Sequence, residues 1–513
     1  MNKITIAKHH FKLFFLLLLI INTGLFAQPA FVKDSLDSYV KREMERWQVP
    51  GLAIAIVKDG KVVVCKGFGV KQDGKSAKVD ENTLFQIASN SKAFTGTSIA
   101  LLNSQKRLLL DEKVTKYMPD FKLYDETSTS LCTVRDLLCH RIGLQTFQGD
   151  FLNWGSNLSR KEIIEHLALT KPVHPFRYKY GYCNSAFITA GELIKNVTDT
   201  SWDDFIKYHF FEPLAMKHTS STYNELMTDE NACIPHTLVN GKIAKLPYTN
   251  IDNMGPSASI NSCAKDMANW LLFQLDSGRF EGKRIVPFSV LAETRKSNMI
   301  SNDVNSKIFK TKHFSNYGLG WQSYDYEGRR VWEHSGGANG FVTKTEFIPE
   351  ENLGVLVYTN TDANSLYDAL VKQVLEAYLN VPYRNLSEKY FVPTNNGRIA
   401  EQKELDSLSQ VVLLKNKPTM ELQNYVGTYS NSFYGEVEIR LLKGKMTLHF
   451  SHHPNNIGKL EYLGNDQFLC TYSDLTCGVQ VLPIKMDNNQ VKGITVKVAD
   501  FIDYLSYDFE KVR

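Results

Sequence analysis

The stretch that decides the fold is residues 51–69, which read GLAIAIVKDGKVVVCKGFG. Two apolar, β-rich runs flank Asp59 and Gly60, a pair that favours a two-residue hairpin turn. Strand signals return at residues 331–332, 344–347 and 353–358, whereas residues 134–275 carry mostly helix and loop signals. The sequence therefore predicts an α/β (α+β) fold, in which an antiparallel sheet is flanked by helices and carries an inserted, mostly helical subdomain.

The C-terminal part of the chain has a different pattern. Short alternating runs such as residues 437–441 and 446–450 predict antiparallel strands, so residues 421–513 are expected to form a separate all-β accessory domain. Residues 385–420 are polar and are predicted to be a linker that contains a helix of its own. The main domain is then expected to comprise residues 28–384.

Residues 1–27 have the pattern of a signal peptide. Three lysines precede an apolar run over residues 14–21, and a plausible cleavage point follows Ala27. We therefore expect an exported protein, periplasmic or secreted. An uncleaved N-terminal anchor is the alternative, and it is the one membrane contact that the sequence allows, because no later segment is apolar and long enough to cross a bilayer.

The composition is that of an ordinary globular protein. Of 513 residues, 43% are hydrophobic and 22% are charged, and this length favours two or three domains. Lys and Arg total 59 against 55 Asp and Glu, a balance that gives no reason to expect a nucleic-acid partner. The eight cysteines are scattered, so buried free thiols are expected for most of them. Cys470 and Cys477 lie close together in the chain and are the one candidate disulfide pair.

No spacing of His and Cys indicates a metal site, and no metal or other cofactor is expected. His452 and His453 precede Pro454 in a polar stretch, and we expect them to be solvated. The order of residues predicts no oligomeric state.

Residues 89–92 read SNSK and place a hydroxyl and an amine three positions apart. On the first turn of a helix, Ser89 and Lys92 face the same way. A lysine whose ammonium form is disfavoured by burial accepts the serine proton, and the helix N-terminus favours the developing anion. The spacing alone is weak evidence, because residues 38–41 and 262–265 repeat it.

Two further patterns would complete such a site. Tyr182 and Asn184 place a phenol, which shuttles a proton, beside an amide, which holds the lysine or a substrate carbonyl. After His334 and Ser335, Gly336 and Gly337 let a substrate approach the backbone and leave amide donors for an oxyanion. Each pattern alone is more often a packed ring or a turn between strands, and only their conjunction favours catalysis.

The longer strings around these residues resemble those of the serine β-lactamase-related hydrolases, the superfamily of class C β-lactamases, D-aminopeptidases and esterases. The resemblance runs from about residue 37 to residue 378. It rests on an ordered set of strings: TLFQIASNSKAFT at residues 83–95, LDEKV at 110–114, TVRDLLCHRIGL at 133–144, YGLGW at 317–321 and HSGGANGF at 334–341.

The resemblance implies an acyl-enzyme mechanism. Ser89 would be the nucleophile and Lys92 its activating partner. Tyr182 would act as the general base in acylation and as the acid that protonates the leaving group. Asn184 would orient Lys92 and the substrate, and water would then release the acyl group.

The same resemblance places His334 where lactamases and penicillin-binding proteins usually have Lys. The backbone N–H groups of Ser89 and Gly337 would form the oxyanion hole, and Gly336 with Gly337 would line the substrate-binding strand. Without a permanent charge at residue 334 for a substrate carboxylate, esterase or peptidase activity on a small acyl, peptide or ester substrate is favoured.

Three alternatives stay open: β-lactamase activity, D,D-carboxypeptidase activity and a catalytically silent binder of cell-wall fragments. The silent binder is suggested by departures from the family pattern. Residues 256–262 lack the usual glycine pair, and Ala215 stands where glycine is usual. Cys183 lies inside the second motif and is expected to be an inert packing residue.

Overall fold

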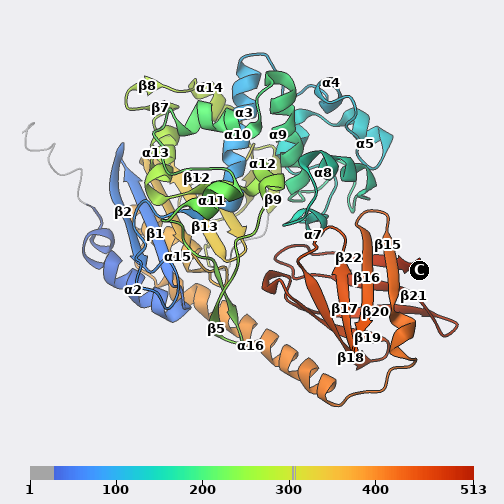
Figure 1. Cartoon of the computed structure of the whole chain (residues 1–513). Coiled ribbons are helices and arrows are strands. Elements are labelled where there is room, and N and C mark those ends of the chain that lie inside the picture. The colour runs from blue at the N-terminus through green and yellow to red at the C-terminus, as the bar shows by residue number, and fades with distance from the viewer. Residues whose placement is uncertain (1–27, 303–305, 307, 513) are drawn as a thin grey trace, which may run out of the picture.

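The computed structural model describes residues 28–302, 306 and 308–512 (Figure 1). The predicted signal peptide lies outside these residues. Over the described ranges, no helix has the length and apolar character needed to span a membrane.

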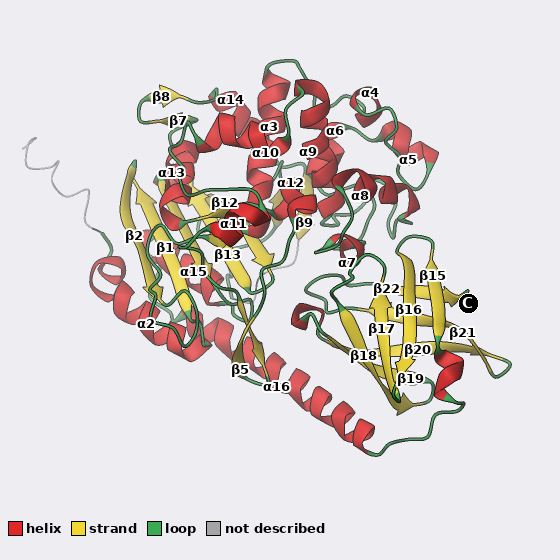
Figure 2. Cartoon of the chain, viewed as in Figure 1, coloured by secondary structure: helices red, strands yellow, loops and turns green. Residues whose placement is uncertain are grey.

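An antiparallel sheet of eight strands forms the centre of the main domain and confirms the predicted fold class (Figure 2). The predicted hairpin is present, and both Asp59 and Gly60 have positive φ angles, 50° and 74°, as a tight hairpin turn requires. The strand order is β2-β1-β14-β13-β12-β11-β10-β9. The bounds are β1 Gly51–Lys58, β2 Lys61–Gly69, β9 Met299–Asn302, β10 Ser315–Tyr317, β11 Gln322–Tyr326, β12 Arg329–Ala338, β13 Phe341–Ile348 and β14 Leu353–Thr359.

Helices cover both faces of this sheet, which explains why residues 52–57 of β1 are all apolar. Its larger side chains Leu52, Ile54 and Ile56 belong to the core beneath α2 (Leu36–Trp47) and α15 (Leu366–Tyr378). Its smaller side chains Ala53 and Ala55 face the opposite core, to which α3 (Ser91–Ser104) and α13 (Ala264–Leu275) contribute. Successive residues of a strand point to opposite faces, so one strand serves two cores.

The predicted helical insertion lies between β2 and β9. Short strand pairs interrupt it: β3 Phe85–Gln86 with β6 Asn261–Ser262, β4 His236–Val239 with β5 Lys242–Lys245, and β7 Arg279–Phe280 with β8 Lys283–Arg284. The remaining helices of the insertion are α4 Val114–Tyr117, α5 Glu126–Leu131, α6 Val134–Leu138, α7 Asp150–Asn153, α8 Arg160–His166, α9 Asn184–Thr198, α10 Trp202–Ile206, α11 Tyr223–Thr228, α12 Gly255–Ala258 and α14 Phe288–Thr294.

A long helix, α16 (Leu386–Leu413), leads from the main domain to the C-terminal domain (Figure 1). That domain is a closed barrel of eight antiparallel strands, which agrees with the all-β expectation. The strands are β15 Gly427–Asn431, β16 Gly435–Leu442, β17 Lys445–Phe450, β18 Ile457–Gly464, β19 Gln467–Tyr472, β20 Val479–Asp487, β21 Gln490–Lys497 and β22 Ser506–Lys511.

The barrel packs against the main domain around α7. The ring of Phe151 stacks on Tyr434 with centroids 4.8 Å apart and lies parallel to His453 at 5.6 Å. Phe151 is 3% exposed, so this one helical turn inserts an aromatic side chain into the barrel. Removing such a side chain typically costs about 3 to 5 kcal/mol, which makes Phe151 a main anchor between the domains.

The expectation that His453 is solvated was wrong. His453 is buried, donates from Nε2 to the carbonyl oxygen of Trp154 at 3.0 Å and accepts the Tyr434 hydroxyl at Nδ1 at 2.6 Å. Docking of the barrel on α7 causes this burial. Cys470 and Cys477 are both buried free thiols, so the candidate disulfide between them is not formed.

Candidate active site

Ser89 lies on a short turn, Ala88–Asn90, that leads into α3. It is the one residue between Thr83 and Leu102 that is not fully buried. Ala88 has a positive φ angle of 47°, a conformation that is unfavourable for a residue with a Cβ. This strained turn brings the Ser89 hydroxyl to the surface of an otherwise closed core.

The serine turn is fixed to the central sheet by polar contacts. Asn90 donates from Nδ2 to the Thr343 hydroxyl at 2.9 Å, and that hydroxyl donates to the Ile87 carbonyl oxygen at 3.0 Å. The approach is close, since a Cβ added to Gly336 would lie 2.1 Å from the Ile87 oxygen. Gly336 is therefore needed to let β12 pass beside the turn.

Lys92 is completely buried beneath Ser89. Its Nζ donates to Ser89 Oγ at 3.1 Å, to Asn184 Oδ1 at 2.6 Å and to the carbonyl oxygen of Ser257 at 2.9 Å. Burial lowers the pKa of Lys92 to about 7, although the carboxylate of Asp150 acts in the opposite direction. When Lys92 is neutral, two hydrogens serve Asn184 and Ser257, and the lone pair is free to accept the serine proton.

Tyr182 lies on the other side of Ser89 and hydrogen-bonds to it. Its ring packs against His140 at 4.2 Å and against Phe147 at 5.6 Å, and the Lys92 ammonium lies 4.6 Å from its centroid. Burial raises the pKa of Tyr182 above its ordinary value. The phenol therefore keeps its proton at neutral pH, so it is suited to donate a proton, whereas Lys92 is suited to accept one. This arrangement favours the acid role expected of Tyr182 and gives the role of general base in acylation to Lys92 instead.

Asp150 is a member of this network that the sequence did not indicate. Asn184 donates from Nδ2 to Asp150 Oδ2 at 2.6 Å while its own Oδ1 holds Lys92. Asp150 is 3% exposed, and burial together with the carboxylate of Asp503 raises its pKa well above the usual range. Because Asp150 and Asn184 lie 34 residues apart, no local spacing pointed to the pair.

His334 faces the same cleft from β12 and is 5% exposed. Its Nδ1 donates to the carbonyl oxygen of Ser335 at 2.6 Å, so its Nε2 accepts the Tyr317 hydroxyl at 2.8 Å. Burial and the nearby Lys92 lower the pKa of His334 to about 3. The imidazole is thus neutral, and it brings no positive charge to the place where lysine is usual.

Most of the predicted site residues meet at one cavity of about 550 Å³, whereas Gly336 packs against the serine turn and is not among the described residues that line the cavity. Ser89, Tyr182, Asn184, His334 and Gly337 all line it, and Lys92 lies directly behind Ser89. The described residues that line the cavity include the carboxylates of two aspartates and no Lys or Arg. The cavity therefore offers a substrate carboxylate no cationic partner.

The loops that depart from the family pattern have a clear structure. Residues 255–258 form one helical turn, α12, and this turn supplies the Ser257 carbonyl oxygen to Lys92. Ala215 has a φ angle of 52°, the left-handed region in which glycine is favoured. Cys183 is buried, which raises the pKa of its thiol to about 12 and leaves it protonated, as expected of a packing residue.

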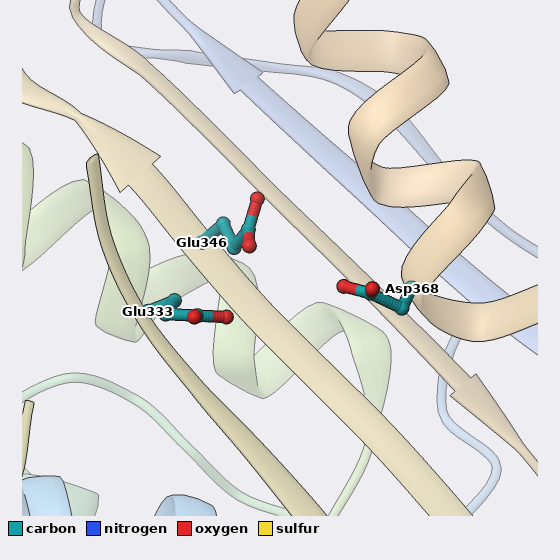
Figure 3. Close-up of side chains that lie close together, drawn as sticks. All are labelled: Glu333, Glu346 and Asp368. Carbon is teal, nitrogen blue, oxygen red and sulfur yellow. The ribbon is translucent and has the colours of Figure 1, made fainter. Parts of the chain in front are cut away.

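Behind β12, on the face opposite His334, three carboxylates gather within reach of one another: Glu333 and Glu346 on neighbouring strands and Asp368 on α15 (Figure 3). Lys344 contacts all three, at 3.4 Å from Glu346 and 3.3 Å from Asp368, and Lys372 contacts Glu346. Despite burial, these lysines hold the pKa of Asp368 well below its usual range. The cluster is a buried ion-pair network that supports the active-site strand.

A sheet between helices, with a serine at a helix start above a buried lysine, defines the class of β-lactamase-like serine hydrolases. A family described as Beta-lactamase matches residues 36–378, and the chain belongs to this family. Residues 414–511, which contain the barrel, match a domain of unknown function, DUF3471.

Individual relatives are distant. The chain is 26% identical over 334 residues to Protein flp of Staphylococcus aureus (strain MW2), a match that covers 64% of each protein and thus less than two thirds of that relative. It is 25% identical over 454 residues to Unguisins hydrolase ungD of Aspergillus violaceofuscus, covering 81% of this chain and 78% of that protein.

Solved structures share the fold. The octameric penicillin-binding protein homologue from Pyrococcus abyssi aligns with a TM-score of 0.59 at 21% identity, over 93% of this chain and 99% of that one. SurE aligns with a TM-score of 0.56 at 15% identity, over 93% of this chain and 98% of that one.

We predict that kcat/KM for p-nitrophenyl acetate rises with pH through an inflection near 7, because only neutral Lys92 accepts the serine proton. Asp150→Asn removes a group whose negative charge raises the Lys92 pKa, so the inflection should move to lower pH. Profiles from about pH 5 to 9 measure this. Asp120→Asn, an exposed control, should leave the inflection in place. An unmoved or raised inflection in Asp150→Asn contradicts the electrostatic role.

Proposed function

We propose that the protein is a serine hydrolase that cleaves an amide or ester bond through an acyl-enzyme on Ser89, and that it is of peptidase or esterase type. The observation that carries this proposal is the contact of Ser89 Oγ with the fully buried Lys92 Nζ at 3.1 Å. Such a lysine is present in substantial part as the free amine at neutral pH, because its pKa is near 7.

In acylation, neutral Lys92 takes the Ser89 proton as Oγ attacks the substrate carbonyl carbon. The backbone N–H groups of Ser89 and Gly337 stabilise the resulting oxyanion. Tyr182 donates its proton to the leaving alcohol or amine and is reprotonated from Lys92, so the C–O or C–N bond breaks and the acyl group stays on Ser89. In deacylation, water attacks the acyl-enzyme and its proton returns through the same groups to Ser89 Oγ.

The charge of the cleft supports an uncharged substrate. His334 is neutral and already bound to Tyr317, and the described cavity lining contains no Lys or Arg. A β-lactam or a peptide C-terminus would bring a carboxylate with no cation to meet it. A relative named as a hydrolase of unguisins is consistent with a hydrolytic activity in this family.

The alternatives rest on weaker observations. β-Lactamase or D,D-carboxypeptidase activity is suggested by the family but opposed by the uncharged His334. A silent binder of cell-wall fragments is opposed by the complete network around Lys92. Export to the periplasm or medium is also proposed here, on the pattern of residues 1–27 alone.

We predict that a fluorophosphonate forms a single covalent adduct with the purified protein and that Ser89→Ala abolishes it. Ester turnover should fall by at least about a thousandfold in Ser89→Ala, because the nucleophile is lost. Intact-mass spectrometry and p-nitrophenyl ester assays measure both. Ser38→Ala, which removes the serine of a second Ser-x-x-Lys spacing, is the matched control. If folded wild-type protein forms no adduct, the proposed hydrolase activity is contradicted and a catalytically silent binder is favoured.

We further predict that His334→Lys increases penicillin turnover relative to ester turnover by roughly tenfold, the scale of one hydrogen bond to a charged group. The physical reason is that the variant provides a cation for the β-lactam carboxylate. His334→Gln, which adds no charge, should leave the ratio unchanged. An equal or lower ratio in His334→Lys would refute the charge argument.

A further inference from the structure

The C-terminal barrel does more than pack beside the main domain, since it contributes to the active-site cavity. The segment 499–505 between β21 and β22, here called the barrel loop, places Asp500, Phe501, Ile502 and Tyr504 in the lining of the cavity that contains Ser89. We infer that the barrel loop is a specificity-determining wall, in which Phe501 limits the size of the acyl group. This inference rests on the proposed function.

Phe501 lies directly over the proposed oxyanion strand. A Cβ placed on Gly337 would lie 3.2 Å from Cε2 and 3.3 Å from Cζ of the Phe501 ring. The ring is therefore at van der Waals distance from this part of β12, and no substrate atom fits between the two. Phe501 nevertheless is 41% exposed, and it is among the residues that line the cleft.

The wall is held in place by a buried carboxylate. Asp503 is completely buried, and its Oδ2 accepts hydrogen bonds from the backbone N–H groups of Gly149 at 3.1 Å and Phe151 at 3.2 Å. The Tyr507 hydroxyl donates to the same oxygen at 2.7 Å. The barrel loop is thus tied to the start of α7, the turn that carries Asp150. A loop anchored in this way presents Phe501 in a fixed position.

A second aromatic side chain extends the wall toward Tyr182. The ring of Tyr504 lies 5.4 Å from that of Phe147, which in turn packs on Tyr182 at 5.6 Å. Since the leaving group must face its proton donor Tyr182, the acyl substituent extends on the other side of the carbonyl, beside Gly337 and Phe501. Asp500 contacts Lys497 at 2.9 Å, which offsets its charge. The chemistry of this wall suits a short, uncharged acyl group.

The test compares p-nitrophenyl acetate with p-nitrophenyl octanoate on the full-length protein. Phe501→Ala should raise the octanoate-to-acetate ratio of kcat/KM by at least about tenfold, the scale expected when a pocket gains space for several methylenes. Phe501→Trp should lower the ratio. Phe288→Ala, at a phenylalanine of α14 that is similarly exposed, is the matched control.

The inference about Phe501 is wrong if the protein hydrolyses p-nitrophenyl acetate but Phe501→Ala changes the octanoate-to-acetate ratio of kcat/KM by less than about twofold. That result would leave the proposed function intact. A wild-type protein that neither turns over acetate nor forms a fluorophosphonate adduct on Ser89 overturns the proposed function and, with it, this inference. Circular dichroism of each variant confirms that the ratio is measured on folded protein.

Discussion

The burial of the Lys92 amine is the constraint on which the active site depends. An ammonium group without water is costly unless acceptors surround it, and here Ser89, Asn184 and Ser257 each supply one. These acceptors come from three separate parts of the insertion, so the fold must close around Lys92 before the site exists. Burial of the amine costs folding free energy because it removes water from the charged form. The same loss of water lowers the pKa of Lys92 into the range in which the amine accepts a proton.

The barrel and the catalytic network meet at a single turn of helix. Along α7, Asp150 points toward Asn184 while the next residue, Phe151, inserts between Tyr434 and His453 of the barrel. Asp503 ties the barrel loop to the same turn. The positions of the barrel and of Asp150 are therefore linked through one short element. A shift of the barrel would move α7 and, with it, the carboxyl group beside Asn184 and Lys92.

The sequence predicted those parts of the molecule that depend on residues close together in the chain. The hairpin at Asp59 and Gly60, the sheet and the all-β character of the C-terminal domain follow from short-range patterns. Ser89 and Lys92 follow from helical spacing together with the resemblance of the strings around them. Asp150 was missed because its partner lies 34 residues away. His453 was wrongly expected to be solvated, and the barrel loop escaped notice, because their surroundings arise only when two domains dock.

The central claim is that Ser89 attacks with the help of Lys92 in a cleft that the barrel closes. A crystal structure of the protein inhibited by a short-chain phosphonate tests this most directly. The account predicts phosphorus bonded to Ser89 Oγ, one phosphonyl oxygen about 2.7–3.1 Å from the backbone nitrogens of Ser89 and Gly337, and the alkyl group against Phe501. An oxygen turned away from both nitrogens, or a Lys92 amine withdrawn from Ser89, would contradict it.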